Sequence, residues 1–164
     1  MIQRISSPAL ALFLAIFASV SVRANAADTI TEDQIHALIQ RVDDAIIKRD
    51  VPALLASFTD DAAIISDWLS AEGVSKKKFT KPEYGEYVKE QFPTATKRER
   101  THANTKIAIT DGGTKATVTT ETTEAVTMPN ATLKMPTRET FKLTRHGDKL
   151  LIASLDLSLP NDSK

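Results

Sequence analysis

The sequence has no cysteine among its 164 residues. Disulfide bonds, thiolate metal sites and cysteine nucleophiles are therefore excluded. The chain also lacks a serine set between glycines in a nucleophile elbow, and it lacks a glycine-rich phosphate loop. Acyl hydrolysis by a serine triad and nucleotide binding through such a loop are both disfavoured.

An excess of charge of one sign is missing as well. The chain contains 21 Lys and Arg residues and 21 Asp and Glu residues, which gives a formal net charge of zero. A protein that follows the phosphates of a nucleic acid needs a basic field to capture the backbone. We therefore expect no nucleic-acid partner.

The few histidines are not spaced as metal ligands. His36, His102 and His146 lie far apart, and no pair has the four-residue separation that places two imidazoles on one helix face. Since cysteine is absent too, we predict no bound metal, and nothing in the sequence indicates a cofactor.

No apolar run is long enough to span a membrane as a helix. The longest, from Pro8 to Val22, contains 15 residues, whereas a spanning helix needs about 20. It follows a short start with one positive charge, Arg4, and precedes the small residues Ala24-Asn25-Ala26. This order is typical of a cleavable secretory signal peptide. We predict that residues 1–26 are a signal peptide and that the chain is cleaved near Ala26.

Cleavage there leaves residues 27–164, the size of one globular domain. We predict a single exported domain, periplasmic or secreted, with no membrane association after cleavage. An exported domain without cysteine fits a Gram-negative periplasm best.

The first half of this domain has helical patterns. Apolar residues recur at steps of three and four between Ile35 and Ile46 and form one face of an amphipathic helix, with Thr31 as its N-cap. The charged residues of the opposite face are expected in solvent. Pro52 suits the start of a short second helix that runs to Phe58.

Between the second and third helices we expect a short strand over residues 62–66 and a loop over residues 69–79. Pro82 and Glu83 suit the first turn of the third helix, which begins near Thr80 and continues to Gln91.

The second half reads as strands. A turn at residues 111–113 follows one strand, a run rich in threonine and valine covers residues 115–128, and a connection with two prolines covers residues 129–136. Residues 137–145 alternate, with Glu139, Phe141 and Leu143 on one face, and a last strand covers residues 149–157. We predict an α+β domain in which about three N-terminal helices cover one face of a curved antiparallel sheet.

This element order, with the segment Phe58-Thr59-Asp60-Asp61-Ala62-Ala63-Ile64 after the second helix, resembles the SnoaL-like, nuclear transport factor 2-like superfamily. The resemblance covers residues 31–157 and implies a cone-shaped fold with a pocket inside. Ketosteroid isomerase, scytalone dehydratase and epoxide hydrolases share this fold with many binding and assembly modules. The fold alone therefore does not determine the function.

Ketosteroid isomerase needs a carboxylate base, a tyrosine and a protonated carboxylic acid. The resemblance places Val42 at the position of the tyrosine and Glu139 at the position of the protonated acid. The base falls on Ser66, or on Asp67 if the strand is shifted by one residue. Because valine donates no hydrogen bond, ordinary steroid isomerisation is disfavoured.

Three residues are the catalytic candidates. Asp67 and Glu139 form the best pair, since burial of both inside the cone would raise their pKa values towards a useful range. In the opposing interpretation, Asp67 caps a loop and Glu139 is bound to a lysine or arginine at the rim of the sheet. His102 is a third candidate, as a general base that faces inward.

The pocket candidates are aromatic: Trp68, Tyr84, Tyr87 and Phe141. Trp68 either lines the mouth of a pocket or closes the open end of the sheet, and each tyrosine either reaches the cavity or packs in the core. Two basic clusters, at residues 76–78 and 97–100, are interpreted as solvated or as the rim of a site for an acidic ligand.

Three hypotheses for the function follow. The first is an exported module that binds a small, partly apolar ligand without assigned catalysis. The second is a cofactor-free isomerase, dehydratase or hydrolase that uses Asp67 or His102 as base and Glu139 as acid. The third is an assembly module that forms a homodimer through the threonine-rich face of its sheet, which includes Thr117, Thr119, Thr123 and Thr127.

Overall fold

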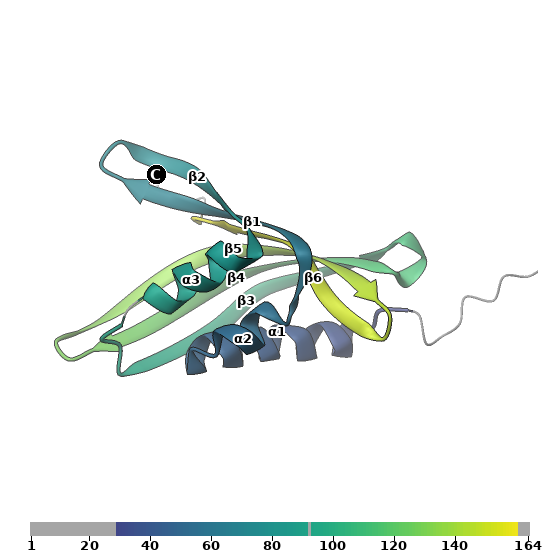
Figure 1. Cartoon of the computed structure of the whole chain (residues 1–164), viewed down its shortest axis with the longest axis horizontal. Coiled ribbons are helices and arrows are strands. Elements are labelled where there is room, and N and C mark those ends of the chain that lie inside the picture. Colours follow the sequence, from purple (N-terminus) through teal and green to yellow (C-terminus); the bar gives the residue numbers. More distant parts are fainter. Residues whose placement is uncertain (1–28, 92, 161–164) are drawn as a thin grey trace, which may run out of the picture.

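The computed structural model of the chain describes residues 29–91 and 93–160. The predicted signal peptide and its cleavage site lie outside the described residues. Within them the chain forms three α-helices, six strands and one short 3-10 turn, Asp111–Gly113. All three helices lie on one face of the sheet (Figure 1). The α+β class and the cone-like arrangement agree with the prediction.

Helix α1, Glu32–Lys48, begins and ends as its sequence indicates. The side chain of Thr31 accepts from the backbone N–H of Gln34, and the side chain of Gln34 accepts from the backbone N–H of Thr31, which is a complete capping box. At the other end Arg49 adopts the left-handed conformation, with φ of 56°. The buried stripe of α1 contains the predicted apolar residues and one acid, Asp43.

Helices α2, Val51–Leu55, and α3, Lys81–Glu90, are both capped at their N-termini. Asp50 caps α2, and Thr80 forms a capping box with Glu83 in α3. Helix α2 is shorter than predicted, because Phe58 already begins the first strand. The two helices pack closely at Gly85, where a Cβ atom would lie 2.8 Å from Leu55 Cδ1.

The six strands form one sheet in the order β2-β1-β6-β5-β4-β3. The strands are β1 Phe58–Ser70, β2 Gly73–Phe79, β3 Lys97–Thr110, β4 Lys115–Met128, β5 Ala131–His146 and β6 Lys149–Ser158. Strands β3 to β6 pair antiparallel, as predicted. The sheet is nevertheless mixed, because β1 pairs parallel with β6.

The predicted loop over residues 69–79 is wrong. Residues 73–79 form β2, which pairs antiparallel with β1 and makes a hairpin that projects from the body of the domain (Figure 1). The pattern misled because β2 has no buried face before Phe79: residues 73–78 are all exposed. A strand exposed on both faces lacks the apolar alternation by which strands are recognised.

The predicted connection over residues 129–136 is also wrong. Strand β5 begins at Ala131, so only Pro129 and Asn130 make the turn, and Pro136 lies within the strand opposite Thr123. The pairing of β5 with β6 starts only at Arg138. Pro136 therefore lies in a stretch of β5 that has β4 on one side alone. Proline is tolerated in such edge positions of a sheet.

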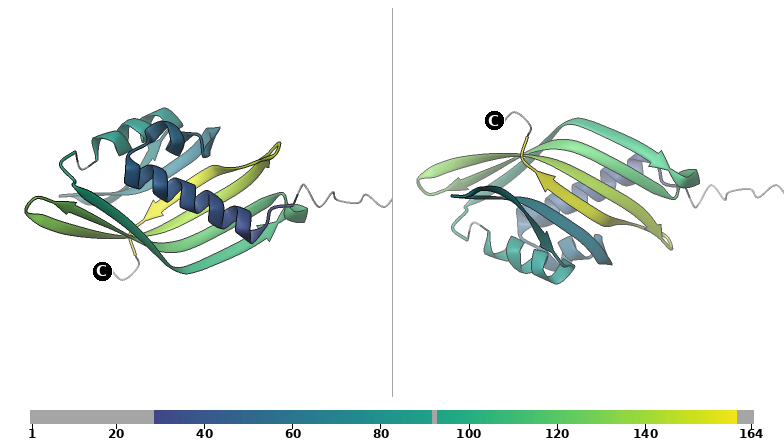
Figure 2. Two further views of the ribbon diagram at one scale, coloured as in Figure 1. Left: turned by 90° about the horizontal axis from the view of Figure 1, so that it is seen from below. Right: turned by 90° about the horizontal axis from the view of Figure 1, so that it is seen from above.

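Irregular pairing bends the sheet towards the helices. The pairing of β3 with β4 shifts between Ala103 and Lys106, and Asn104 there has φ of 53°. Bulges of this kind increase local twist and curvature. The three described helices lie in the concave face, and none of them lies over the opposite face of β3 to β6 (Figure 2).

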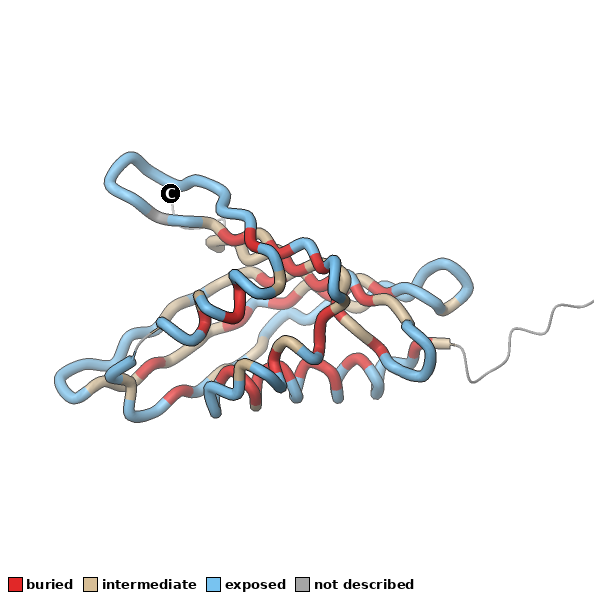
Figure 3. Tube along the Cα trace, viewed as in Figure 1, coloured by how far each residue is buried: buried red, intermediate tan, exposed pale blue. Residues whose placement is uncertain are grey.

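The core lies between α1 and the concave face of the sheet, where the buried segments of both face one another (Figure 3). Its largest fully buried side chains include Ile35, Leu38, Phe141, Leu143 and Ile152. None of the helices in the described ranges is long and apolar enough to cross a membrane.

Candidate functional site

A cavity of about 200 Å³ opens between the helices and the concave face of the sheet. Its wall includes apolar side chains, from Ile46 and Val88 of the helices and from Met135, Leu157 and Leu159 on the strand side. It also carries charged side chains: Asp67, Arg98, Arg100, Glu124 and Glu139. We call these charged residues the polar wall, although Leu157 lies directly opposite Glu139 on the neighbouring strand.

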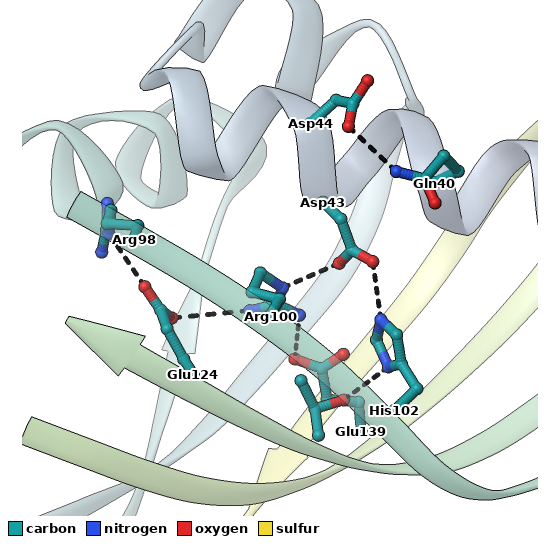
Figure 4. Close-up of polar contacts among 9 residues, drawn as sticks. Gln40, Asp43, Asp44, Arg98, Arg100, His102, Glu124 and Glu139 are labelled. Atoms are coloured by element: carbon teal, nitrogen blue, oxygen red, sulfur yellow. Dashed lines mark hydrogen bonds and ion pairs between the residues drawn. The ribbon is translucent and has the colours of Figure 1, made fainter.

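Arg100 on β3 is the centre of a buried ionic network that backs this polar wall (Figure 4). Its Nε donates to Asp43 Oδ1 of α1 at 2.7 Å, and its Nη2 donates to Glu139 Oε1 of β5 at 2.7 Å. Its Nη1 lies 3.5 Å from Glu124 Oε2 of β4. The guanidinium is nearly buried, with 6% of its side chain exposed.

Strand geometry explains why these groups meet. Residues two apart on a strand share a face, so Arg98, Arg100 and His102 of β3 all point into the concave side. The register places Arg100 opposite Glu124. Arg98 Nε donates to the other oxygen of that carboxylate, Glu124 Oε1, at 2.8 Å.

Asp43 connects the helix layer to this network. Its Oδ1 accepts from Arg100, and its Oδ2 lies 2.6 Å from His102 Nε2. Burial alone would raise the pKa of Asp43, but the hydrogen bond from His102 and the charge and hydrogen bond of Arg100 outweigh it and hold the pKa below its ordinary value. Asp43 is therefore an ionised acid on the buried face of α1.

Glu139, predicted as the protonated acid of the site, lies on the cavity wall with 4% of the residue exposed. Its Oε1 is held by Arg100, whereas its Oε2 is buried and has no hydrogen-bond partner among the described residues. The charge of Glu139, together with that of Asp43, outweighs the effect of burial and raises the pKa of Arg100 above its ordinary value. Both interpretations of Glu139 therefore apply: it faces the cavity, and it is bound to an arginine.

Asp67 and Ser66, the two alternatives for the base, both line the cavity. Asp67 Oδ1 lies 2.8 Å from Lys76 Nζ, and its Oδ2 accepts from the backbone N–H of Leu159 at 2.9 Å. Burial raises the pKa of Asp67, but these hydrogen bonds and the charge of Lys76 outweigh it, and the pKa lies below its ordinary value. The expectation of a raised pKa at this residue is wrong, because the β2 hairpin brings Lys76 beside it.

The four aromatic candidates take different places. Tyr84 and Tyr87 line the cavity, with their rings 6.3 Å apart. Burial, and then the charge of Glu139, raises the pKa of Tyr84, so its hydroxyl stays protonated. Phe141 is not on the cavity wall: it is 2% exposed and packs in the core.

Trp68 is also not on the cavity wall, because it lies on the outer part of the β1–β2 hairpin with 40% of its surface exposed. Its ring contacts that of Tyr87 at 6.2 Å between centroids, and Lys77 Nζ lies 4.6 Å from its centre. Trp68 of the hairpin thus packs against Tyr87 of α3.

His102 faces inward, as the third catalytic candidate requires, but it does not reach the cavity itself. Its Nδ1 lies 3.0 Å from Thr122 Oγ1, and Thr122 is one of the lining residues. No group of His, Asp and Glu residues in the described ranges is arranged to hold a metal ion.

Sequence reasoning missed Asp43 as a site residue. Of the two interpretations of the cluster at residues 97–100, the solvated one is wrong for Arg98 and Arg100, which are buried in ion pairs and line the cavity. The signal was present in α1, since Asp43 lies four residues after Ile39 and three before Ile46, inside the apolar stripe. A charge in that stripe needs a buried partner of opposite sign.

Comparison with known proteins supports the fold described above. Residues 35–162 match the family described as the SnoaL-like domain. No protein with curated function matches the sequence.

Many solved structures match in fold. An NTF2-like protein of unknown function from Pseudomonas putida has a TM-score of 0.62 and 19% identity over 81% of this chain and 89% of that one. ActVI-ORFA from Streptomyces coelicolor has a TM-score of 0.62 and 15% identity, covering 77% and 94% of the two chains. A hexachlorocyclohexane dehydrochlorinase, LinA type 2, has a TM-score of 0.60 and 13% identity, covering 76% and 82%. At such identities the likeness shows a common fold.

Proposed function

Because this chain belongs to the family of SnoaL-like domains, we propose that it binds a small, partly apolar molecule in the cavity between its helices and its sheet. The observation that carries the proposal is the cavity itself, whose wall combines apolar side chains with Glu139, a buried acid that has one oxygen, Oε2, without a hydrogen-bond partner among the described residues. Sites for small molecules combine apolar walls with a few convergent polar groups in this way.

The buried charges support a binding role over a purely structural one. A buried ion pair contributes little net stability compared with apolar side chains of similar volume. The chain nevertheless keeps two arginines and three acids beside the cavity: Arg98, Arg100, Asp43, Glu124 and Glu139. Drug-sized ligands occupy pockets of about 300–1,000 Å³, so a cavity of about 200 Å³ suits a smaller molecule.

Ligand binding is tested by thermal unfolding in the presence of a library of small metabolites. A ligand that binds only the folded state raises the melting temperature by mass action. The variant Leu157→Phe, which fills the cavity, is expected to lose the shift. The matched variant Val74→Phe, on the exposed hairpin, is expected to keep it. Equal shifts in both variants would place the ligand elsewhere and contradict the proposal.

A cofactor-free enzyme is the second candidate, favoured by the contact of 2.6 Å between His102 Nε2 and Asp43 Oδ2. One protein of similar fold is a hexachlorocyclohexane dehydrochlorinase. Dehydrochlorination is an elimination, a class of reaction that removes a proton. Asp67, Glu139 and His102 are the candidates for moving that proton. Each of them already contacts a partner within the protein, which is why binding without catalysis ranks first.

The two candidates differ in turnover. A nitrobenzisoxazole opens when a base removes its ring proton, and so reports any general base in an apolar cavity. An enzyme of this kind would accelerate the opening, and Glu139→Gln or Asp67→Asn would remove the acceleration while ligand binding remained. Equal rates with and without protein would leave binding as the function.

Homodimerisation through the sheet completes the proposed picture. The support is the face of β3 to β6 over which none of the three described helices lies (Figure 2). In β4, Thr117, Thr119, Thr123 and Thr127 alternate with the inward-facing residues and so lie on this face. The solution mass, measured by light scattering, separates a dimer from a monomer. A Thr119→Arg variant would shift a sheet-mediated dimer to the monomer, and an unchanged mass would rule out this face.

Export is the remaining part of the proposal, and its support is the order of charge, apolar run and small residues in 1–26. Expression of the full chain in a Gram-negative host, followed by N-terminal sequencing of the periplasmic fraction, tests it. The expected mature protein begins at Ala27. Full-length protein confined to the cytoplasm would contradict export.

A further inference from the structure

The hydrogen-bonding capacity of the polar wall is almost entirely used within the protein. Arg100 donates through Nε, Nη1 and Nη2 to three different carboxylates. Both oxygens of Glu124 accept from arginines, and both oxygens of Asp43 are engaged, by Arg100 and His102. Glu139 Oε2 alone among these carboxylate oxygens is without a partner in the described part of the chain. The network therefore offers the cavity an acceptor.

Asp67, the second acid to consider on the cavity wall, also has partners within the protein. Asp67 uses one oxygen for Lys76 and the other for the backbone N–H of Leu159. Ser66 Oγ donates to the backbone oxygen of Asp67. The charge of Asp67 is paired with Lys76, although its Oδ1 has no hydrogen bond among the described residues. Glu139 Oε2 has neither a hydrogen bond nor a cation of its own in that part of the chain, so the polar end of an occupant belongs at Glu139.

The charges of the network do not cancel when His102 is neutral. Asp43, Glu124 and Glu139 carry three negative charges, and Arg98 and Arg100 carry two positive charges. Asp67 pairs with Lys76 outside this network, and Lys76 also lies 3.4 Å from the partly exposed Asp156. An unbalanced charge in a buried site is unfavourable unless a partner of opposite sign lies beside it. A positive charge at Glu139 Oε2 would complete the balance.

The aromatic wall is compatible with such a charge. Tyr84 and Tyr87 both line the cavity, and their rings stack at 6.3 Å between centroids. The faces of aromatic rings attract cations that lie within about 6 Å. Ile46, Val88 and Leu157 supply apolar surface in the same cavity for the body of such a ligand.

From these four observations we infer that the cavity recognises a small protonated amine, whose ammonium group donates to Glu139 Oε2 and whose apolar body lies against the helices. The inference rests on the proposed binding function and names the chemical class of its ligand. It runs against the first impression given by two arginines on the wall, which would suggest a carboxylic acid. All three nitrogens of the Arg100 guanidinium already donate to carboxylates of the protein. The carboxylate of an acidic ligand would also lie beside Glu139, which carries a charge of the same sign.

The test compares three probes of nearly equal size: benzylamine, benzyl alcohol and benzoate. Their dissociation constants for the purified full chain are measured by calorimetry at about pH 7, where benzylamine is protonated and benzoate is ionised. Benzylamine is expected to bind about tenfold more tightly than benzyl alcohol, since a charge-assisted hydrogen bond is about twice as strong as a neutral one. Benzoate is expected to bind most weakly. Benzoate binding as tightly as benzylamine would overturn the inference.

Two variants assign the preference to its residue. Glu139→Gln is expected to reduce the affinity for benzylamine to that for benzyl alcohol. Glu121→Gln, an exposed acid that pairs with Arg138 away from the cavity, is expected to change neither. A preference for the amine that survives Glu139→Gln would also overturn the inference.

A matched pair of substitutions keeps the inference testable if Glu139→Gln does not fold. Met135 lies on the cavity wall and is partly exposed. Met135→Lys places an ammonium group beside the network, and Met135→Glu places a carboxylate there. The lysine variant is expected to have the higher melting temperature, and the reverse order would contradict the inference.

The outcomes separate this inference from the proposed function. If compounds of other classes bind in the cavity and no amine does, the ligand class is wrong and small-molecule binding stands. If no compound of any class changes the melting temperature, both are wrong.

Discussion

Arg100 donates to one carboxylate oxygen of Glu139 at 2.7 Å, while the other oxygen of this cavity-lining residue is buried and has no hydrogen-bond partner among the described residues. The same arginine binds Asp43 of α1 and so joins the helix layer to the sheet. Fold stability and the shape of the cavity wall therefore depend on one side chain. Changes in this network are expected to affect both.

Replacement of Arg100 by methionine tests how strongly the network holds the domain together. Arg100→Met leaves Asp43, Glu124 and Glu139 close together without their central cation. Removing one partner of a buried ion pair lowers stability by about 3–5 kcal/mol. Urea denaturation is expected to show a loss of this size.

Lys97→Met is the control for this substitution. Lys97 pairs with Glu99 on the surface, with 62% of its side chain exposed. Such pairs contribute at most about 1 kcal/mol. Equal losses in the two variants would show that burial of the Arg100 network does not matter for stability.

The stability of the protein is expected to fall in acid partly because of Asp43. Its pKa in the folded state lies below the ordinary value of 3.8, since His102 and Arg100 together outweigh the effect of burial. An acid with a lowered pKa contributes its full stabilisation above the ordinary value and loses it as the pH falls through the folded value. Protonation thus removes this contribution below about pH 4.

The measurement compares the free energy of unfolding of the wild type and of Asp43→Asn as a function of pH. The difference between them is expected to be largest above about pH 4 and to shrink as the pH falls further. Asp67→Asn should behave in the same direction, because the pKa of Asp67 is also lowered. A difference that grows towards low pH would contradict the assigned sign.

The assignment of Phe141 to the core and of Leu157 to the cavity gives a third prediction. Phe141 is 2% exposed, and Phe→Ala changes in cores cost about 3–5 kcal/mol. Phe141→Ala is expected to lower stability by this amount, and the milder Phe141→Leu by less. Neither is expected to change the affinity for a cavity ligand once folded. Leu157→Ala, on the cavity wall, is expected to weaken that affinity.

The pattern of α1 and of strands β4 to β6 followed from the sequence, because one face of each is buried. The alternation at residues 137–145 correctly placed Glu139, Phe141 and Leu143 on the inner face. Strand β2 escaped because its residues before Phe79 are exposed on both faces, and the start of β5 escaped because Pro136 resembled a turn signal. Periodicity reports burial and carries little information where burial is absent.

The site was only partly predictable for a different reason. Asp67 and Glu139 were identified from the resemblance to ketosteroid isomerase, and both line the cavity. The partners of these two acids were not identified. Lys76 reaches Asp67 across a hairpin, and Arg100 reaches Glu139 from β3 across the intervening strand β4. Such contacts depend on register and packing, which a single sequence does not specify.

The bulge in β3 supplies a prediction about the backbone. Asn104 has φ of 53°, a region that asparagine and glycine tolerate and β-branched residues do not. Asn104→Val is expected to lower stability by at least about 1–2 kcal/mol. Asn104→Gly loses only the exposed hydrogen bond to Glu121 and is expected to change stability by less than about 1 kcal/mol. Similar losses in both variants would refer the effect to that hydrogen bond instead.

Thr122 links His102 to the cavity, and its hydroxyl gives the last prediction. The hydroxyl lies 3.0 Å from His102 Nδ1, and the residue is 2% exposed. Thr122→Val keeps the shape of the side chain but leaves the ring nitrogen facing a methyl group. An unsatisfied buried polar group lowers stability by about 1–3 kcal/mol.

The serine variant separates the hydroxyl from the methyl group of Thr122. Thr122→Ser keeps the contact with His102 and removes one buried methyl, which is expected to lower stability by about 1 kcal/mol. Thr122→Val should therefore be the less stable of the two in urea, although it is the more hydrophobic. The opposite order would mean that the hydroxyl contributes nothing to the positioning of His102, and that the contact between Asp43 and His102 is sufficient to hold the ring.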